Sequence, residues 1–242
     1  MTDLLTNIKI NIEDVPERVI VCGDPKRAHQ IASLLKETKI LGQNREYHSY
    51  SGTWKGVTVA VVSHGVGAPG AAVCFEELIL GGTRKLIRVG TAGSYQAELP
   101  PGSLVVSTSS VRRDGLTSQL VPEGVPAVAD RHLVESLVGA ANRLNTDLVV
   151  KEGMTLTLDA FYSGVLEFPH QLYKKAGVLA AEMECSALFV IAALRGAQAG
   201  AILAIDGFAD ADLLEVYNPH TDTVAKAIEA EALIALDAIT NN

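Results

Sequence analysis

The chain has 242 residues, which fits one domain with a substantial buried core. With 48% hydrophobic residues and a mean hydropathy of +0.23, its composition is that of a compact α/β protein. The formal net charge of -8 argues against nonspecific binding to nucleic acid, so an anionic ligand must be held by local positive charge.

The sequence has none of the segments or residue spacings that are typical of membrane, secreted or metal-binding proteins. Its apolar runs are shorter than the roughly 18 to 20 residues that cross a bilayer, and residues 1–5 do not resemble a signal peptide. Cys22, Cys74 and Cys185 are scattered, and the six histidines show no metal-ligand spacing. We therefore expect a cytoplasmic protein with buried thiols, no metal site and no membrane partner.

Apolar runs and segments of helical periodicity alternate along residues 1–242, and no linker, repeat or low-complexity segment divides them. The expected strands are 19–22, 50–56, 56–63, 85–89, 103–107 and 201–205. The expected helices are 26–36, 72–80, 131–144, 186–195 and 223–239. This alternation predicts a single α/β domain in which helices flank a mixed, largely parallel sheet.

Two glycine-containing corners follow apolar runs and carry arginines. At the first, Gly23 allows a close backbone approach, Pro25 suits the first turn of a helix, and Arg27 follows. The alternative is an ordinary strand-to-helix turn with a solvated arginine. Backbone amides together with a guanidinium group make a receptor for a phosphate-like anion.

The second corner places Arg88 inside an apolar strand, followed by the small-residue turn 90–93 that contains Thr91. A buried charge needs a partner, which is either an internal carboxylate or a bound anion, and we favour the anion. The two corners predict one phosphate held from two sides.

Carboxylates and aromatics further along suit a sugar and a base. Glu182 and Glu184 surround Met183, and carboxylates can grip a vicinal diol, although acids at a helix start are common without a ligand. Asp206 ends a core strand, where it suits either acid chemistry or a simple turn. The aromatic pair 161–162 is by residue type more often core than a stacking surface. No GxSxG or Walker pattern is present.

Taken in order, these segments resemble one family. Gly-Asp-Pro-Lys-Arg, Asn-Arg-Glu-Tyr, Ser-His-Gly-Val-Gly, Arg-Val-Gly-Thr-Ala-Gly, Glu-Met-Glu and the late Asp-Gly are similar to motifs of the hexameric nucleoside phosphorylases, which include purine and uridine phosphorylases. The resemblance covers nearly the whole chain. It implies a mixed sheet with a partly closed, barrel-like core, and a homohexamer built as a trimer of dimers.

The resemblance also implies roles for particular residues. The implied phosphate ligands are Gly23, Arg27, Arg88, Thr91 and, from the neighbouring subunit, Arg45, which residue type alone does not single out. The implied ribose contacts are Met183, Glu184 and the nearby Glu182, with Asn7 reaching across the dimer interface in place of the histidine common in purine enzymes. The implied base site holds Phe161, Ala92, Gly93 and Asp206, with Asp206, Arg45 and Arg88 as the catalytic groups.

The implied reaction is reversible phosphorolysis of a purine ribonucleoside or deoxyribonucleoside, with inosine and guanosine favoured. Orthophosphate is the co-substrate, and no metal or organic cofactor is needed. Residues 163–168 lack the glutamine and arginine that read uracil in uridine phosphorylases, which disfavours uridine, although segments 110–115 and 126–130 are similar to that branch. Gly70 replaces a serine expected at an interfacial potassium site beside Glu46, so we do not predict that ion. The alternatives are a uridine phosphorylase, a nucleosidase, which three arginines disfavour, and a nucleoside-binding protein without turnover.

Overall fold

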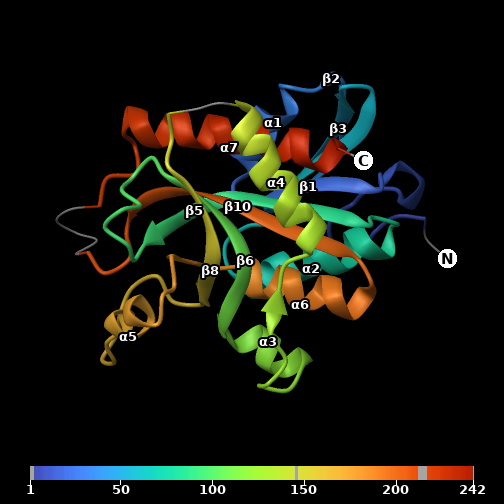
Figure 1. Ribbon diagram of the computed structural model, residues 1–242. Coiled ribbons are helices and arrows are strands. Elements are labelled where there is room, and N and C mark those ends of the chain that lie inside the picture. Colours follow the sequence, from blue (N-terminus) through green and yellow to red (C-terminus); the bar gives the residue numbers. More distant parts are fainter. Residues whose placement is uncertain (1–2, 145–146, 212–216, 242) are drawn as a thin grey trace.

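A computed structural model of the chain describes residues 3–144, 147–211 and 217–241 (Figure 1). The strands are β1 (Arg18–Cys22), β2 (Lys36–Asn44), β3 (Tyr47–Trp54), β4 (Val57–Ser63), β5 (Lys85–Ser94), β6 (Leu104–Arg113), β7 (Ala127–Val128), β8 (Val150–Leu158), β9 (Ala180–Glu182) and β10 (Gln198–Phe208). The helices are α1 (Pro25–Ala32), α2 (Ala68–Leu80), α3 (Gly115–Leu120), α4 (Arg131–Leu144), α5 (His170–Lys175), α6 (Cys185–Arg195) and α7 (Asp222–Thr240), with a 3₁₀ turn at Ile12–Asp14.

The strands form one mixed sheet in the order β10-β6-β8-β9-β5-β1-β4-β3-β2, with β7 beside β6. An additional pairing of β10 with β5 closes the first five strands of this order into a barrel. Parallel pairing joins β4, β1, β5 and β10, and the antiparallel β2–β3–β4 meander extends the open end. The expected mixed α/β sheet with a barrel-like core is therefore confirmed.

Helices cover the sheet on both sides. On one side α7 packs against β1, β5 and β10, beside α4, while α1 covers β3 and β4. On the other side α2 and α6 lie against each other, as Figure 1 shows below the sheet. α6 and α7 are rich in alanine and leucine, so their backbones come close to the strands, and most residues of both are buried.

One of the expected helices ends early. α4 has the bounds that its periodicity predicts, but the helix expected over 26–36 stops at Ala32, and Lys36 begins β2. The Lys-Glu-Thr-Lys sequence has no strong strand signal, yet pairing with β3 makes it the outer strand of the meander. Its charged side chains are typical of an edge strand that must not aggregate.

Two strands continue past the turns expected to end them. β5 runs through the 90–93 segment to Ser94, and β10 runs through Asp206 to Phe208, because the two strands pair along this whole length. The 90–93 segment is therefore not a free turn, and its small residues instead allow close packing. A Cβ on Gly93 would lie 2.9 Å from the Ala209 Cα, a distance that real Cβ atoms do not show.

The core is continuous from the N-terminal segment to α7. Cys22, Cys74 and Cys185 are buried free thiols, as expected. Across the described part of the chain, no helix combines the length and apolar character needed to cross a membrane.

Candidate active site

One cavity of about 1400 Å³ opens where β1, β5, β9 and β10 end. It is lined by most of the residues predicted to form the site: Gly23, Arg27, Arg88, Thr91, Ala92, Gly93, Phe161, Glu182, Met183, Glu184 and Asp206. These residues are up to 183 positions apart in the sequence, and the barrel brings them together. The sheet thus places its polar groups at strand ends, where open α/β sheets bind ligands.

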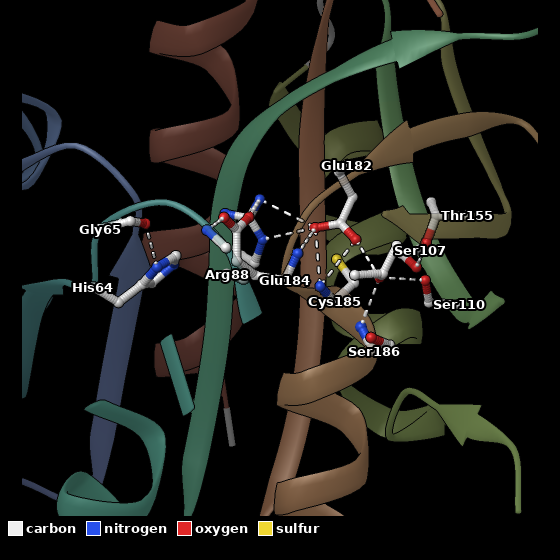
Figure 2. Close-up of polar contacts among 12 residues, drawn as sticks. His64, Gly65, Arg88, Ser107, Ser110, Thr155, Glu182, Glu184, Cys185 and Ser186 are labelled. Carbon is white, nitrogen blue, oxygen red and sulfur yellow. Dashed lines mark hydrogen bonds and ion pairs between the residues drawn. The ribbon is translucent and has the colours of Figure 1, made fainter. Parts of the chain in front are cut away.

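Arg88 is paired with carboxylates of its own chain (Figure 2). Its Nη2 lies 3.2 Å from Glu182 Oε2 and 2.5 Å from Glu184 Oε2, and Nε also donates to Glu182. Burial disfavours the charged guanidinium, but Glu184 and Glu182 outweigh this effect and raise the pKa of Arg88. The buried charge that the sequence shows therefore has internal carboxylate partners in this structure, and the anion that we favoured as its partner stays a prediction.

Glu182 holds Arg88 in place. Its carboxylate accepts hydrogen bonds from Arg88, from the Thr157 hydroxyl at 2.5 Å, and from the backbone amides of Glu184 and Cys185 at 2.7 and 2.9 Å. Figure 2 shows Arg88 on one side of this carboxylate and Cys185, at the start of α6, below it. These donors occupy both oxygens of Glu182 and fix the orientation of its carboxylate, which in turn holds the Arg88 guanidinium.

Glu184 joins Arg88 to the start of α2. Its Oε1 accepts from the Gly67 backbone amide at 2.6 Å, and Gly67 caps α2 with a φ of 93° that glycine adopts without strain. Burial raises the pKa of Glu184, and the nearby Arg88 opposes that shift. Glu184 lines the cavity beside Met183, where its oxygens can reach a ligand hydroxyl.

Asp206 is presented by an irregularity in β10. The pairing with β5 shifts between Ile205 and Gly207, so Asp206 is left out of the ladder like the extra residue of a β-bulge. Its carboxyl is 7% exposed, and Oδ2 accepts a hydrogen bond from the Tyr217 hydroxyl at 2.8 Å. Burial raises the pKa of Asp206, while Tyr217 and Thr91 partly oppose that shift. A carboxyl held this way is suited to carry a proton.

The first corner has the strand-turn-helix form that its sequence predicts. Asp24 caps α1 by accepting from the Lys26 amide at 2.8 Å, and Pro25 is in the first turn. Gly23 lies against Gly65, whose carbonyl oxygen would be 3.1 Å from a Cβ placed there. Arg27 extends from α1 to the cavity wall.

The aromatic pair is at the mouth of the cavity and not in the core. Phe161 and Tyr162 are 45% and 69% exposed, so the interpretation as core, which residue type favours, is wrong. Phe161 contacts Tyr217 edge to face, with ring centroids 6.1 Å apart. An exposed ring beside a polar cavity is available for stacking.

Arg45 and Asn7 do not line the cavity of their own chain. Arg45 is at the tip of the β2–β3 hairpin, exposed, with a φ of 53° that is unusual for a residue with a side chain. The Asn7 side chain donates to Glu77 at 2.5 Å, and the Asn44 amide donates to the Asn7 carbonyl at 2.7 Å. Both residues therefore belong to one corner of the surface.

Sequence reasoning did not find some residues of the site. Tyr217 belongs to no motif, and no local sequence signal points to it. In the fold its ring packs against Gly207, 2.8 Å from a Cβ placed there. Glu167 and His170 also line the cavity. Within residues 3–144, 147–211 and 217–241, no three His, Cys, Asp or Glu side chains are grouped to hold a metal ion.

Comparison with known proteins identifies the family. Residues 17–240 match the model of the phosphorylase superfamily. The guanosine phosphorylase of Halorubrum lacusprofundi is 34% identical over 235 residues, which cover 94% of both chains. The uridine phosphorylase of Thermococcus kodakarensis is 34% identical over 239 residues, covering 93% of this chain and 82% of that protein.

A solved structure agrees with this assignment. The purine nucleoside phosphorylase of Toxoplasma gondii in complex with immucillin-H superposes with a TM-score of 0.95 and 32% identity, over 100% of this chain and 97% of that one. Relatives of this kind act on nucleosides, and both purine and uridine enzymes are among them. The chain therefore belongs to the phosphorylase superfamily, as a nucleoside phosphorylase.

Proposed function

We propose that this chain is a purine nucleoside phosphorylase, which cleaves inosine and guanosine with orthophosphate to give the free base and ribose 1-phosphate. The observation that carries the proposal is Asp206, a buried carboxyl with a raised pKa that faces the cavity. A purine leaves more easily when N7 is protonated or hydrogen-bonded, and a carboxyl whose burial favours the protonated form can supply that group. A uracil base has no N7 for it.

The geometry supports a division of the cavity into three parts. Gly23, Arg27 and Arg88 provide the phosphate end, Met183 and Glu184 the ribose wall, and Phe161 with Asp206 the base end. Phosphate attacks C1′ as the glycosidic bond breaks, and its negative charge stabilises the positive charge that develops on the sugar. Asp206 gives its proton to the leaving base. No covalent intermediate with the protein is formed.

Glu184 has two tasks in this scheme. In the structure it binds Arg88 and the Gly67 amide, whereas in the complex it accepts hydrogen bonds from the ribose hydroxyls. One guanidinium shared by two carboxylates leaves an excess negative charge, which opposes a phosphate dianion. Engagement of Glu184 by ribose therefore makes Arg88 more available to phosphate.

The base end supports a purine over uracil. The residues of the 160s segment that line the cavity include Ser163 and Glu167, and neither supplies the amide-and-guanidinium pair expected for uracil. Glu167 is a carboxylate that can accept a hydrogen bond from an N–H group of a 6-oxopurine, while Asp206 serves N7.

We further propose a cytoplasmic homohexamer, assembled as a trimer of dimers, in which Arg45 and Asn7 complete the neighbour's site. Two observations support this proposal. Arg45 is presented at a hairpin tip outside its own cavity, and Asn44 ties that hairpin to the segment of Asn7. Contacts from Ser63 to Glu46 and from Tyr47 to Gly70 fix the hairpin, so its tip has a defined direction.

The proposal is tested by measuring turnover of inosine, guanosine, adenosine and uridine with and without phosphate. We expect purine cleavage that requires phosphate and little cleavage of uridine. Uridine cleavage alone would make the protein a uridine phosphorylase, and cleavage in water would make it a nucleosidase. If all four stay intact while nucleosides still raise the melting temperature, the protein is a binding protein.

Asp206→Asn tests the acid directly. We expect inosine phosphorolysis to fall by about 10²-fold or more, while nucleoside binding is retained, because the amide keeps the shape but has no acidic proton. Asp210→Asn is the matched control, since Asp210 lines the same cavity but pairs with Lys174 at 2.9 Å. Equal turnover by Asp206→Asn and the wild type would remove Asp206 from the mechanism.

A further inference from the structure

A second buried carboxyl, which the mechanism above does not use, lies behind the phosphate end of the cavity. Glu231 is on the face of α7 that packs on β1, β5 and β10, and it is 1% exposed. Neither of its carboxyl oxygens has a hydrogen-bond partner of good geometry among the described residues. An unsatisfied buried carboxyl is costly to the fold, so it calls for an explanation.

Glu231 faces Arg27. The distance from Glu231 Oε1 to Arg27 Nη1 is 3.8 Å, which is close enough for charge attraction but too long for a hydrogen bond. Within the described part of the chain, Glu231 is the one carboxylate that lies within 4 Å of the Arg27 guanidinium. Arg27 itself is partly exposed at the cavity wall, so it can meet either this carboxyl or a ligand.

Anion binding at the phosphate end depends mainly on the charge of Arg27. Arg88 is already shared between Glu182 and Glu184, so the full positive charge that this chain can offer an anion is that of Arg27. If Glu231 is ionised, it competes for that guanidinium. If Glu231 carries a proton, the competition is gone.

Other groups around Glu231 do not replace Arg27 as its partner. The charged or titratable ones are Arg27 on α1, Arg88 on β5 and the Cys22 thiol on β1. Burial raises the pKa of Cys22 to about 12, so the thiol is uncharged. The backbone amides of Gly90 on β5 and Ala204 on β10 are near enough to favour the ionised form, yet outside good hydrogen-bond geometry.

We propose that Glu231 is a positioning residue for phosphate: its protonated carboxyl leaves Arg27 directed at the cavity, and loss of that proton draws Arg27 back onto Glu231. This inference rests on phosphate being the co-substrate. It follows that binding of a dianion beside Arg27 is accompanied by uptake of one proton by Glu231, wherever that group is ionised beforehand.

The expected pH range follows from burial. Burial raises the pKa of Glu231 to about 8, although Arg27 and Arg88 oppose that shift. Below this pH the site is ready for the anion, and above it the affinity falls as the pH rises. The free energy of unfolding should change in the same direction as the affinity. Because the pKa of Glu231 is raised in the folded protein, ionisation of Glu231 destabilises the fold, and stability falls as the pH rises toward about 8.

The first test uses sulfate, a dianion that does not change its charge between pH of about 6 and 9. Isothermal titration of the wild type at a pH of about 8, in two buffers of different ionisation enthalpy, counts the protons taken up. We expect about half a proton per sulfate, because about half of Glu231 is ionised before binding. No uptake, or no sulfate binding, would overturn the proposal, and this experiment needs no variant and no turnover.

The second test compares Glu231→Gln with the wild type. At each pH we divide the wild-type KM for phosphate by the KM of the variant. Phosphate itself ionises equally in both assays, so its ionisation does not affect this ratio. We expect this ratio to be near 1 at a pH of about 6.5 and about 10 at a pH of about 9, with kcat at saturating phosphate unchanged. Glu231→Gln should also take up less proton than the wild type on binding sulfate.

Glu229→Gln is the control, because Glu229 is exposed on the same helix and undergoes the same change from a carboxyl to an amide. It should behave as the wild type. A purely structural Glu231 would give a variant with an equal loss at every pH, and that result would contradict the proposal. Failure of nucleoside turnover would contradict the proposed function alone, since sulfate binding and its proton uptake are measured separately.

Discussion

At the residue scale, the chemistry of the site depends on the environment of Asp206. The side chain is of an ordinary type, and its special properties come from burial and from the Tyr217 hydroxyl that donates to Oδ2 at 2.8 Å. Burial disfavours the carboxylate, whereas the hydrogen bond from Tyr217 favours it. The pKa of Asp206 is therefore raised by burial and lowered by hydrogen bonds, and mutation of Tyr217 removes one of the contributions that lower it.

Tyr217→Phe removes the effect that stabilises the carboxylate. Since the hydrogen bond lowers the pKa of Asp206, its loss should raise that pKa further and keep the acid protonated to higher pH. We expect the alkaline limb of the kcat profile for inosine, at saturating phosphate, to move up by roughly half to one pH unit. A limb that moves down, or stays in place, would show that Tyr217 does not act on the acid.

Individual residues differ in how far the sequence can predict them. Arg88 could be identified because a charge inside an apolar strand needs a partner, and the structure supplies Glu182 and Glu184. Tyr217 and Glu231 could not be identified, because tyrosine in a loop and glutamate in an amphipathic helix are common. Their importance comes from contacts with residues far along the chain, and a single sequence carries no local signal for such contacts.

At the element scale, strands β5 and β10 determine the shape of the site. The small residues after Arg88 predict a turn, but pairing over the full length of both strands keeps them extended. Local propensity is weak for glycine and alanine, so tertiary pairing decides their conformation. Helix α4 and the apolar strands β1, β4, β5, β6 and β10 were predictable from their apolar patterns, whereas β8 and β9 were not expected. β8 is only partly buried over its first five residues, and the three-residue β9 has too few residues to show a pattern.

Gly90 shows why this strand needs small residues. A Cβ at this position would lie 2.5 Å from Nη1 and 2.9 Å from Cζ of Arg88, whose guanidinium folds back over the glycine. Gly90→Ala should therefore displace Arg88 from Glu182 and Glu184 and raise the KM for phosphate by at least about tenfold. The stability loss should be about 1–3 kcal/mol, as is usual for overpacking.

Steady-state kinetics and thermal unfolding measure these two effects. Gly124→Ala is the matched control, because a Cβ at Gly124 meets nothing within 4 Å. It should leave both the KM for phosphate and the melting temperature nearly unchanged. A Gly90→Ala enzyme with normal phosphate affinity would show that the position of the Arg88 guanidinium is not important for binding phosphate.

At the scale of the whole molecule, one chain holds most of the proposed site but not all of it. The cavity brings together residues from β1 to β10, while Arg45 is outside it on an exposed hairpin tip. Arg45 has a φ of 53°, a turn conformation that it shares with Lys55 at the tip of the next hairpin. The proposed assembly assigns this exposed hairpin tip to the site of a neighbouring subunit.

Complementation between inactive variants tests this arrangement. Arg45→Ala alone should weaken the use of phosphate much more than nucleoside binding, since it removes one charge-assisted contact to the anion. Co-assembly of Arg45→Ala with Asp206→Asn chains should restore about a quarter of the wild-type activity. Half of the random dimers are mixed, and each mixed dimer has one site with both an intact Asp206 and an intact Arg45 from its partner.

The matched control pairs Arg88→Ala with Asp206→Asn. Both residues line the cavity of the same chain, so a mixed dimer of these variants contains no complete site and should stay inactive. If Arg45 served its own chain, Arg45→Ala with Asp206→Asn would also recover nothing. Recovery in the first mixture and silence in the second therefore requires that Arg45 acts across a subunit boundary.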